Sequence, residues 1–163
     1  LKINMKNIII RKARKQDLPA ILLLIKELAS YQKASKEVYI NLKELAAAGF
    51  GKKKIYDCFV AEAALREKNK IVKSIIGIAL YYNKFSTWKG KCIYLEDIIV
   101  TESWRGKGVG KLLFEEVLNV VKKEKVRRFD WQVLNWNKPA IQFYKKYNAV
   151  FDHGQINCKL VFE

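Results

Sequence analysis

Three glycines at alternate positions, Gly106, Gly108 and Gly110, separate two segments of opposite pattern. The residues before them, "KCIYLEDIIVT" (91–101), form a long apolar, β-branched run that is typical of a strand. The residues after them, "KLLFEEVLNVVKKEK" (111–125), repeat apolar side chains at helical spacing. Each glycine costs the folded backbone about 0.5–1 kcal/mol relative to alanine. We therefore expect these glycines to serve a purpose that side chains would obstruct.

A strand, a glycine turn and a helix together favour the binding of phosphate. The first amides of a helix lack intrahelical acceptors, the helix dipole adds partial positive charge, and glycine lets an oxygen approach closely. Arg105, Lys107 and Lys111 add formal charge of the right sign. A Walker A loop needs a longer glycine spacing and a Ser or Thr where Leu112 stands, and a Rossmann fingerprint needs GxGxxG near the first strand. The sequence therefore predicts a phosphate site that is neither a Walker A loop nor a Rossmann fingerprint.

The whole chain, residues 1–163, reads as one domain without a linker. Strand patterns cover residues 7–13, 56–65, 73–83, 91–101 and 127–134, with closing strands at 149–151 and 156–163, and helical patterns cover residues 16–32, 41–51, 111–125 and 137–149. The predicted helix starts are Asp17, Asn41 (with Glu44) and Asn137, and the predicted stops are Gly49 and Asn148. This order predicts an α+β (mixed α/β) fold, a central mixed twisted sheet flanked by about four helices, with parallel pairing around the last two crossovers.

The charge is strongly positive: 32 Lys+Arg against 16 Asp+Glu give +16. Most of these lysines are scattered, as expected of a solvated surface rather than of a tail that binds nucleic acid. Three separated cysteines and the single His153 cannot assemble a zinc pattern, so we expect no metal and reduced thiols in a cytoplasmic protein. The apolar run at 18–25 is too short to cross a bilayer, and no signal peptide is visible. Met5 is the sole methionine, which suggests a cloning remnant at residues 1–4.

Two motifs together resemble a known superfamily. The pattern R-x-x-G-x-G, from Arg105 to Gly110, resembles the acyl-coenzyme A pyrophosphate loop of the GNAT N-acetyltransferases. Further along, "NWNKPAIQFYKKYNAV" is similar to the segment of that superfamily in which an Asn opens a helix that bears a tyrosine. Within the superfamily the chain is more similar to the spermidine/spermine (diamine) N-acetyltransferases, from about Ile8 to Val150. The similar segments are "LIKELASYQ", "GFG", "VAEA", "YLEDIIV", "RGKGVG" and "WNKPAIQFYKKYNA".

The resemblance implies the transfer of an acetyl group from acetyl-coenzyme A to a primary amine of a small acceptor. A diamine or polyamine is the first expectation, and a homodimer is implied as well. A lysine-like amino acid such as thialysine, or another small amine, is the alternative, because Gln32 follows Tyr31 where the polyamine enzymes have a glutamate. In addition, a chain at +16 repels free polyamines at long range.

The chemistry needs a proton acceptor, because a free alkyl ammonium has a pKa near 10.4 and only the neutral amine attacks a thioester. By resemblance, Glu96 takes the amine proton through water and Tyr144 protonates the coenzyme thiolate. In a regular strand Asp97 would face away from Glu96. The residues that we expect to bind the acetyl donor are Ile98, Ile99, Val100, Arg105, Gly106, Lys107, Gly108, Val109, Gly110, Lys111, Asn137, Lys138, Pro139, Ala140 and Tyr144. Tyr31, Glu96 and Trp131 are the expected contacts of the acceptor.

The residues alone leave two further classes of function open. A nucleic-acid-binding module without catalysis is supported by the net charge and by Trp104, Trp131 and Trp136 among basic residues, although no helix-turn-helix, RNP or zinc signature is present. A degenerate acyltransferase fold that senses coenzyme A is the other class. The presence of both Glu96 and Tyr144 argues against it.

Overall fold

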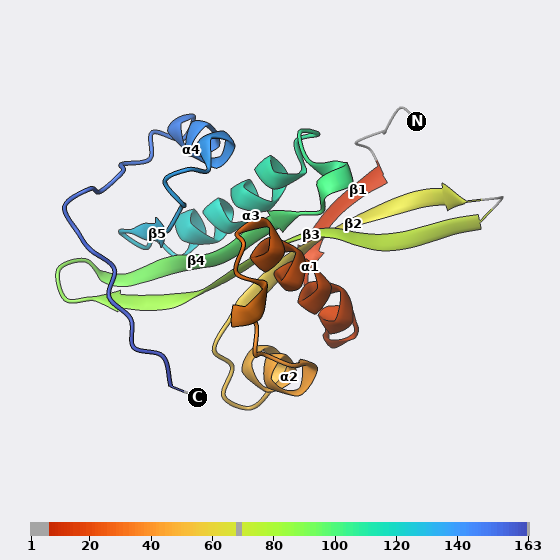
Figure 1. The fold of residues 1–163 in the computed structure, drawn as a ribbon, viewed down its shortest axis with the longest axis horizontal. Coiled ribbons are helices and arrows are strands. Elements are labelled where there is room, and N and C mark those ends of the chain that lie inside the picture. The colour runs from red at the N-terminus through yellow and green to blue at the C-terminus, as the bar shows by residue number, and fades with distance from the viewer. Residues whose placement is uncertain (1–6, 68–69, 163) are drawn as a thin grey trace. The chain divides into compact units, whose positions relative to one another are not determined.

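The structure is a computed structural model that describes residues 7–67 and 70–162, in two units that meet between Trp131 and Gln132. The first unit contains a five-stranded sheet of order β1-β2-β3-β4-β5 (Figure 1). Its elements are β1 (Ile8–Lys12), α1 (Leu18–Tyr31), α2 (Leu42–Phe50), β2 (Asp57–Glu67), β3 (Lys70–Ser86), β4 (Gly90–Val100), α3 (Val109–Lys123) and β5 (Phe129–Trp131). The second unit contains α4 (Lys138–Lys145).

Strands β1 to β4 pair with their neighbours in antiparallel fashion, and β5 pairs with β4 in parallel. The parallel pair needs a crossover, and α3 supplies it between β4 and β5. The predicted mixed sheet and the first predicted crossover are therefore confirmed.

The predicted closing strands are wrong over residues 149–151 and 156–162, because the structure assigns no strand to residues 132–162, and residue 163 lies outside the described residues. Apolar side chains in this segment lie almost fully exposed, with Val150 at 93% and Ile156 at 90%. Strand-like composition produces a strand only where a sheet edge accepts its hydrogen bonds. The second expected parallel pair is accordingly not formed by the described residues.

Glycine at position 49 has a different role from the predicted one. Helix α2 continues through Gly49 to Phe50, so the prediction of a stop there is wrong. A Cβ atom at Gly49 would lie 2.5 Å from the ring of Tyr56, whose hydroxyl donates to Leu45 O at 2.9 Å. Gly49 therefore makes room for a buried tyrosine that attaches α2 to the chain entering β2.

Two of the three predicted helix starts are formed as the sequence indicates. Asn41 accepts from the amides of Lys43 and Glu44, and its own amide donates to the Glu44 carboxylate at 3.0 Å. Asn137 accepts from Ala140 N at 3.3 Å. Asp17 occupies the N-cap position of α1 but makes no capping hydrogen bond to that helix. Helix α4 ends at Lys145, shortly before the predicted stop at Asn148, and Asn148 adopts the left-handed φ of 56° that is typical of a residue after a helix end.

The sheet of the first unit is covered on both faces. Helices α1 and α2 share one buried cluster with the sheet, made of Leu18, Ile21, Leu24, Leu45, Tyr56, Cys58, Val60, Ile78, Leu80 and Ile99. Helix α3 covers the other face, because a Cβ at Gly77, the neighbour of Ile78, would lie 3.1 Å from Leu113 and successive strand residues face opposite sides. The two faces are named below as the α1–α2 face and the α3 face.

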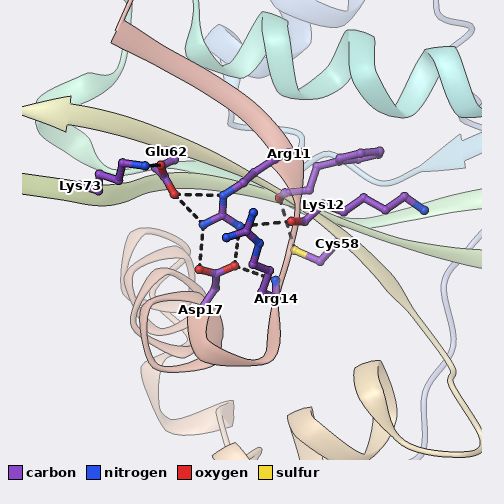
Figure 2. Close-up of polar contacts among 8 residues, drawn as sticks. Arg11, Lys12, Arg14, Asp17, Cys58, Glu62 and Lys73 are labelled. Atoms are coloured by element: carbon purple, nitrogen blue, oxygen red, sulfur yellow. Dashed lines mark hydrogen bonds and ion pairs between the residues drawn. The ribbon is translucent and has the colours of Figure 1, made fainter.

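A charged network joins β1 to the beginning of α1 (Figure 2). Arg11 donates to both carboxylate oxygens of Asp17, at 2.7 and 2.9 Å, and to Glu62 of β2 at 2.7 Å. Lys73 of β3 pairs with Glu62 at 3.3 Å. The hydrogen bonds from Arg11 lower the pKa of Asp17 and that of Glu62 below their usual values. Asp17 is only 6% exposed, so Arg11 compensates a buried charge.

Replacing Arg11 by methionine should lower the free energy of unfolding by about 2–4 kcal/mol at pH 7, because the buried Asp17 carboxylate loses its partner. The pKa of Asp17 is lowered by folding, so this stabilisation is present above the unfolded pKa of about 3.9 and is lost as the pH falls through the folded pKa. Urea unfolding of Arg11→Met at pH 7 and pH 3 measures the difference. The exposed Lys15→Met serves as control, and an equal loss at both pH values would contradict the assignment.

Candidate functional site

Strand β4 has an open edge over its second half. It pairs with β3 from Gly90 to Val100, but β5 accompanies it only from Ile93 to Leu95. Among residues 7–67 and 70–162, no strand pairs with the other edge of β4 beyond Leu95. Main-chain groups on such an edge can bind an extended ligand. Ile98, Ile99 and Val100, which the sequence assigns to the acetyl donor, lie in this half of the strand.

A β-bulge interrupts β4 at Glu96. Leu80 of β3 opposes Asp97 and Tyr81 opposes Leu95, so Glu96 has no opposing residue. The bulge shifts the alternation of side chains between the two faces of the sheet. As a result, Asp97 lies opposite Leu80 on the α1–α2 face. The expectation that Asp97 faces away from Glu96 assumed a regular strand, which the structure does not have.

The bulge brings two carboxylates together with two tyrosines. Tyr82 packs against the α1–α2 core, and its hydroxyl lies near enough to the Glu96 carboxylate for that charge to act on it. Tyr94 opposes Tyr82 across the strand pair, with ring centres 5.3 Å apart. Glu96 and Asp97 therefore lie beside an aromatic pair on one face of the sheet.

Burial and like charge alter the titration of this group. Burial, and secondarily the negative charge of Glu96, raise the pKa of Asp97 to about 6. The same two causes raise the pKa of Tyr82, and they raise the pKa of Tyr94 to about 12. A carboxylate with a raised pKa beside a second carboxylate attracts a cation such as an alkyl ammonium. The sequence reasoning did not assign Asp97 to the site, although an adjacent acidic pair inside an apolar strand was the available signal.

The glycine turn has the backbone that an anion site requires. Gly106 and Gly108 have φ of 71° and 81°, where a side chain would be strained, and Gly108 is the N-cap of α3. The Leu112 amide donates to Gly108 O, so the amides of residues 109–111 precede the helical ladder. No side chain caps this helix start at Gly108. At Gly110 a Cβ would make only an ordinary 3.8 Å contact with Val100, so the fold itself does not require glycine there.

Arg105 lies between the turn and α1. Its Nε donates to Val100 O at 2.9 Å, its Nη2 pairs with Glu27 at 3.0 Å, and its guanidinium lies 4.9 Å from the ring centre of Tyr31. Glu27 also accepts from the amide of Glu102 at 2.9 Å. Glu27 thus connects α1 to the turn, and sequence reasoning did not assign it this contact.

Other predicted residues make local contacts. The ammonium of Lys107 donates to Ser103 O and lies 5.5 Å from the ring centre of Trp104, and Lys111 pairs with Glu115 at 3.8 Å. Trp131 packs edge-on against Phe114 of α3, with ring centres 5.4 Å apart. Its ring therefore contacts the α3 face, whereas Tyr82, on which the charge of Glu96 acts, packs on the opposite face.

The remaining predicted residues belong to the second unit. Asn137 caps α4, and Lys138, Pro139 and Ala140 form its first turn. Tyr144 is 5% exposed and lies edge-on to Phe143 at 5.2 Å. Burial raises the pKa of Tyr144 to about 12, so its hydroxyl is protonated near neutral pH.

Two other kinds of feature are absent from the described residues. No helix there is long and apolar enough to cross a bilayer. No group of three His, Cys, Asp or Glu side chains there is arranged to hold a metal ion.

An open strand edge, a glycine turn at a helix start and an adjacent acidic pair define a site suited to a phosphate-bearing acyl donor and an amine acceptor. The profile of the acetyltransferase (GNAT) family matches residues 21–149. The chain belongs to this family, and it is an N-acetyltransferase with the predicted α+β fold.

The similar proteins include several with named activities. Thialysine N-epsilon-acetyltransferase of Bos taurus is 40% identical over 142 residues, which cover 87% of this chain and 84% of that protein. The Mus musculus enzyme of the same name is 38% identical over 140 residues, 86% of this chain and 82% of that protein. Spermidine/spermine N(1)-acetyltransferase-like protein 1 of Homo sapiens is 31% identical over 141 residues, 86% of this chain but 20% of that protein.

Solved structures show the same fold at lower identity. An integron cassette protein from the mobile metagenome of V. cholerae has a TM-score of 0.70 and 22% identity, covering 96% of this chain and 93% of that one. An aminoglycoside acetyltransferase from an uncultured soil metagenomic sample has a TM-score of 0.74 and 17% identity, covering 98% of this chain and 99% of that one. At these identities the likeness concerns the fold.

Gly110→Ala should separate ligand binding from folding. The free energy of unfolding should stay the same or rise by up to about 1 kcal/mol, because alanine favours a helix and its Cβ has room. The dissociation constant of acetyl-coenzyme A, measured by calorimetry, should rise about tenfold or more, because the Cβ obstructs close approach to the amides. Gly108→Ala is the contrasting variant, since its φ of 81° should cost about 1–2 kcal/mol of stability. Unchanged affinity in Gly110→Ala would exclude the turn as the donor site.

Asp97→Asn should stabilise the protein at alkaline pH. The pKa of Asp97 is raised by folding from about 3.9 to about 6, so ionisation opposes folding and the penalty grows as the pH rises from 4 to 6. The neutral variant should gain on the order of 2 kcal/mol at pH 8 and nothing at pH 3.5. Chemical unfolding at both pH values tests this, with exposed Glu102→Gln as control. A gain that does not depend on pH would show that Asp97 titrates normally.

Proposed function

We propose that this N-acetyltransferase acetylates the side-chain amine of a lysine-like amino acid such as thialysine. Relatives named thialysine N-epsilon-acetyltransferase are 38–40% identical to the chain, whereas the spermidine/spermine-type relative is 31% identical. This difference supports the amino-acid acceptor over the diamine or polyamine that the sequence motifs favoured first. Membership of an enzyme family argues against a nucleic-acid-binding module without catalysis.

The acetyl donor fits the turn and the open edge. The GNAT family implies acetyl-coenzyme A, which supplies the activated thioester when bound. We assign its diphosphate to the amides at the start of α3, with Gly106 and Gly108 shaping the turn and Lys107 and Lys111 adding charge. The main chain of residues 98–100 would hold the extended arm and donate an amide hydrogen bond to the thioester carbonyl. Asn137 to Ala140 would complete donor binding at the start of α4.

The acidic pair would hold and deprotonate the acceptor. An ammonium bound beside Glu96 and Asp97 is attracted by both carboxylates. Glu96 would take its proton through water, as the family resemblance indicates. Asp97 is a better proton acceptor than an ordinary aspartate, because its pKa is about 6. The difference between the pKa of an alkyl ammonium, near 10.4, and that of the carboxyl group is therefore about 4.4, whereas it is about 6.5 for an ordinary aspartate. The two carboxylates therefore combine attraction of the cation with removal of its proton.

Tyr144 would act on the departing sulfur. Its pKa of about 12 keeps its hydroxyl protonated, so it can donate a hydrogen bond as the thiolate develops. An alkyl thiol has a pKa of about 8.5, so complete proton transfer from Tyr144 is uphill by about 3.5 units. We assign Tyr144 to stabilising the sulfur by that hydrogen bond and to relaying a proton that solvent replaces. The likeness to diamine acetyltransferases also supports a homodimer, which light scattering in solution would detect.

An acceptor panel at saturating acetyl-coenzyme A tests the proposal. Thialysine should have a kcat/KM at least about tenfold above that of spermidine, spermine or putrescine, with lysine between, because the more similar relatives are named for thialysine and the acidic pair suits one ammonium. Release of free thiol gives the rate, and mass spectrometry of the product identifies the acetylated nitrogen.

The same assay checks the assigned residues. Tyr144→Phe should lower kcat about 10- to 100-fold, whereas Tyr39→Phe at an exposed position should not. Preference for spermidine would restore the diamine expectation. No transfer to any amine, with acetyl-coenzyme A bound, would indicate a sensor instead.

A further inference from the structure

A second charged group lies on the sheet near the acidic pair. Lys84 of β3 pairs with Asp130 of β5 at 3.4 Å, and Arg128 donates to the same Asp130 oxygen at 3.0 Å. The three side chains are 41%, 23% and 37% exposed in the order Lys84, Asp130, Arg128. This Lys84–Asp130–Arg128 group carries one net positive charge and is open to solvent.

The group lies on the same face of the sheet as Glu96. Lys84 follows Tyr82 by two residues, so both side chains leave the same side of β3. The ammonium of Lys84 lies 5.3 Å from the ring centre of Tyr94, and Asp130 pairs with Tyr94 in the parallel register. Strands β3, β4 and β5 are neighbours in the sheet (Figure 1). Tyr82, Tyr94 and Asp130 therefore form one row across the three strands, and the ends of Lys84 and Arg128 reach Asp130 in that row.

The distance between the Lys84–Asp130–Arg128 group and Glu96 suits an amino acid with a side chain as long as that of lysine. Glu96 follows Tyr94 by two residues, and a rise of about 3.3 Å per residue places Glu96 about 7 Å along β4 from the row that contains Tyr94 and Asp130. The side chain of a lysine-like amino acid joins its terminal nitrogen to its carboxyl carbon through six bonds, which extend to about 7.5 Å. Its apolar middle would pass beside the ring of Tyr94.

We propose that Lys84 and Arg128 bind the α-carboxylate of the acceptor and that Asp130 binds its α-ammonium. This inference rests on the proposed function and names the residues that select an amino acid. A diamine that lacks only the carboxylate keeps the ammonium that Asp130 would bind, but it leaves the positive charges of Lys84 and Arg128 uncompensated, and they repel that ammonium. The group thus favours an amino acid and disfavours a diamine.

The test compares two acceptors that differ in one group. Thialysine and bis(2-aminoethyl) sulfide share the same chain, but the sulfide lacks the carboxylate. In Lys84→Gln, kcat/KM for thialysine should fall about 10- to 30-fold through KM, because a charge-assisted hydrogen bond is lost. For the sulfide, kcat/KM should stay the same or rise, because repulsion is reduced. Arg128→Gln should act in the same direction.

Lys70→Gln is the matched control, since it removes the same charge from the other end of β3. Its kinetics with both acceptors, and the KM for acetyl-coenzyme A in every variant, should equal those of wild type. If Lys84→Gln or Arg128→Gln lowers kcat/KM equally for both acceptors, or does not lower it for thialysine, the assignment of these residues is wrong. The proposed function would still stand in that case, provided that the wild-type enzyme acetylates thialysine. A wild type that prefers the sulfide to thialysine would overturn both.

Discussion

Strand β4 pairs with a neighbouring strand on both edges from Ile93 to Leu95 and on only one edge from Asp97 to Val100. Main-chain donors and acceptors that leave water must find partners. In this protein the unsatisfied edge leads directly to the glycine turn, so the same stretch of chain offers a row of peptide groups and then the positive end of α3. The early end of β5 therefore leaves free the strand edge that we assign to the extended, phosphate-bearing donor.

Arg105 shows how the charge of the turn is distributed. Its guanidinium is held by Val100 O, by Glu27 and by the ring of Tyr31, so its positive charge is partly neutralised within the protein. In the donor site that we propose, recognition of the anion then depends more on the amides and the dipole of α3 than on this side chain. Because Glu27 and Tyr31 belong to α1, any shift of the turn is transmitted to the end of that helix.

Local features were predictable from the sequence, and relations between distant segments were not. The capping box of Asn41 and Glu44 involves residues three apart, and the pattern itself contains both partners. Glu27 and Arg105 are 78 residues apart, and nothing in either segment indicates the pair. The bulge at Glu96 is a mismatch between two strands, so "YLEDIIV" alone could not reveal it. Residues 156–163 have the composition of a strand, but composition does not say whether a neighbour accepts it. Roles that involve Asn137 and Tyr144 stay predictions.

The bulge also divides β4 into two segments that are out of phase with each other. Substitutions upstream of Glu96 alter the surface around Tyr94, whereas the main chain downstream keeps its own orientation. Such a strand allows selection to remodel one half while leaving the other unchanged. Substitutions in the upstream half could thus change which amine is accepted, without altering the downstream segment that we assign to the acetyl donor.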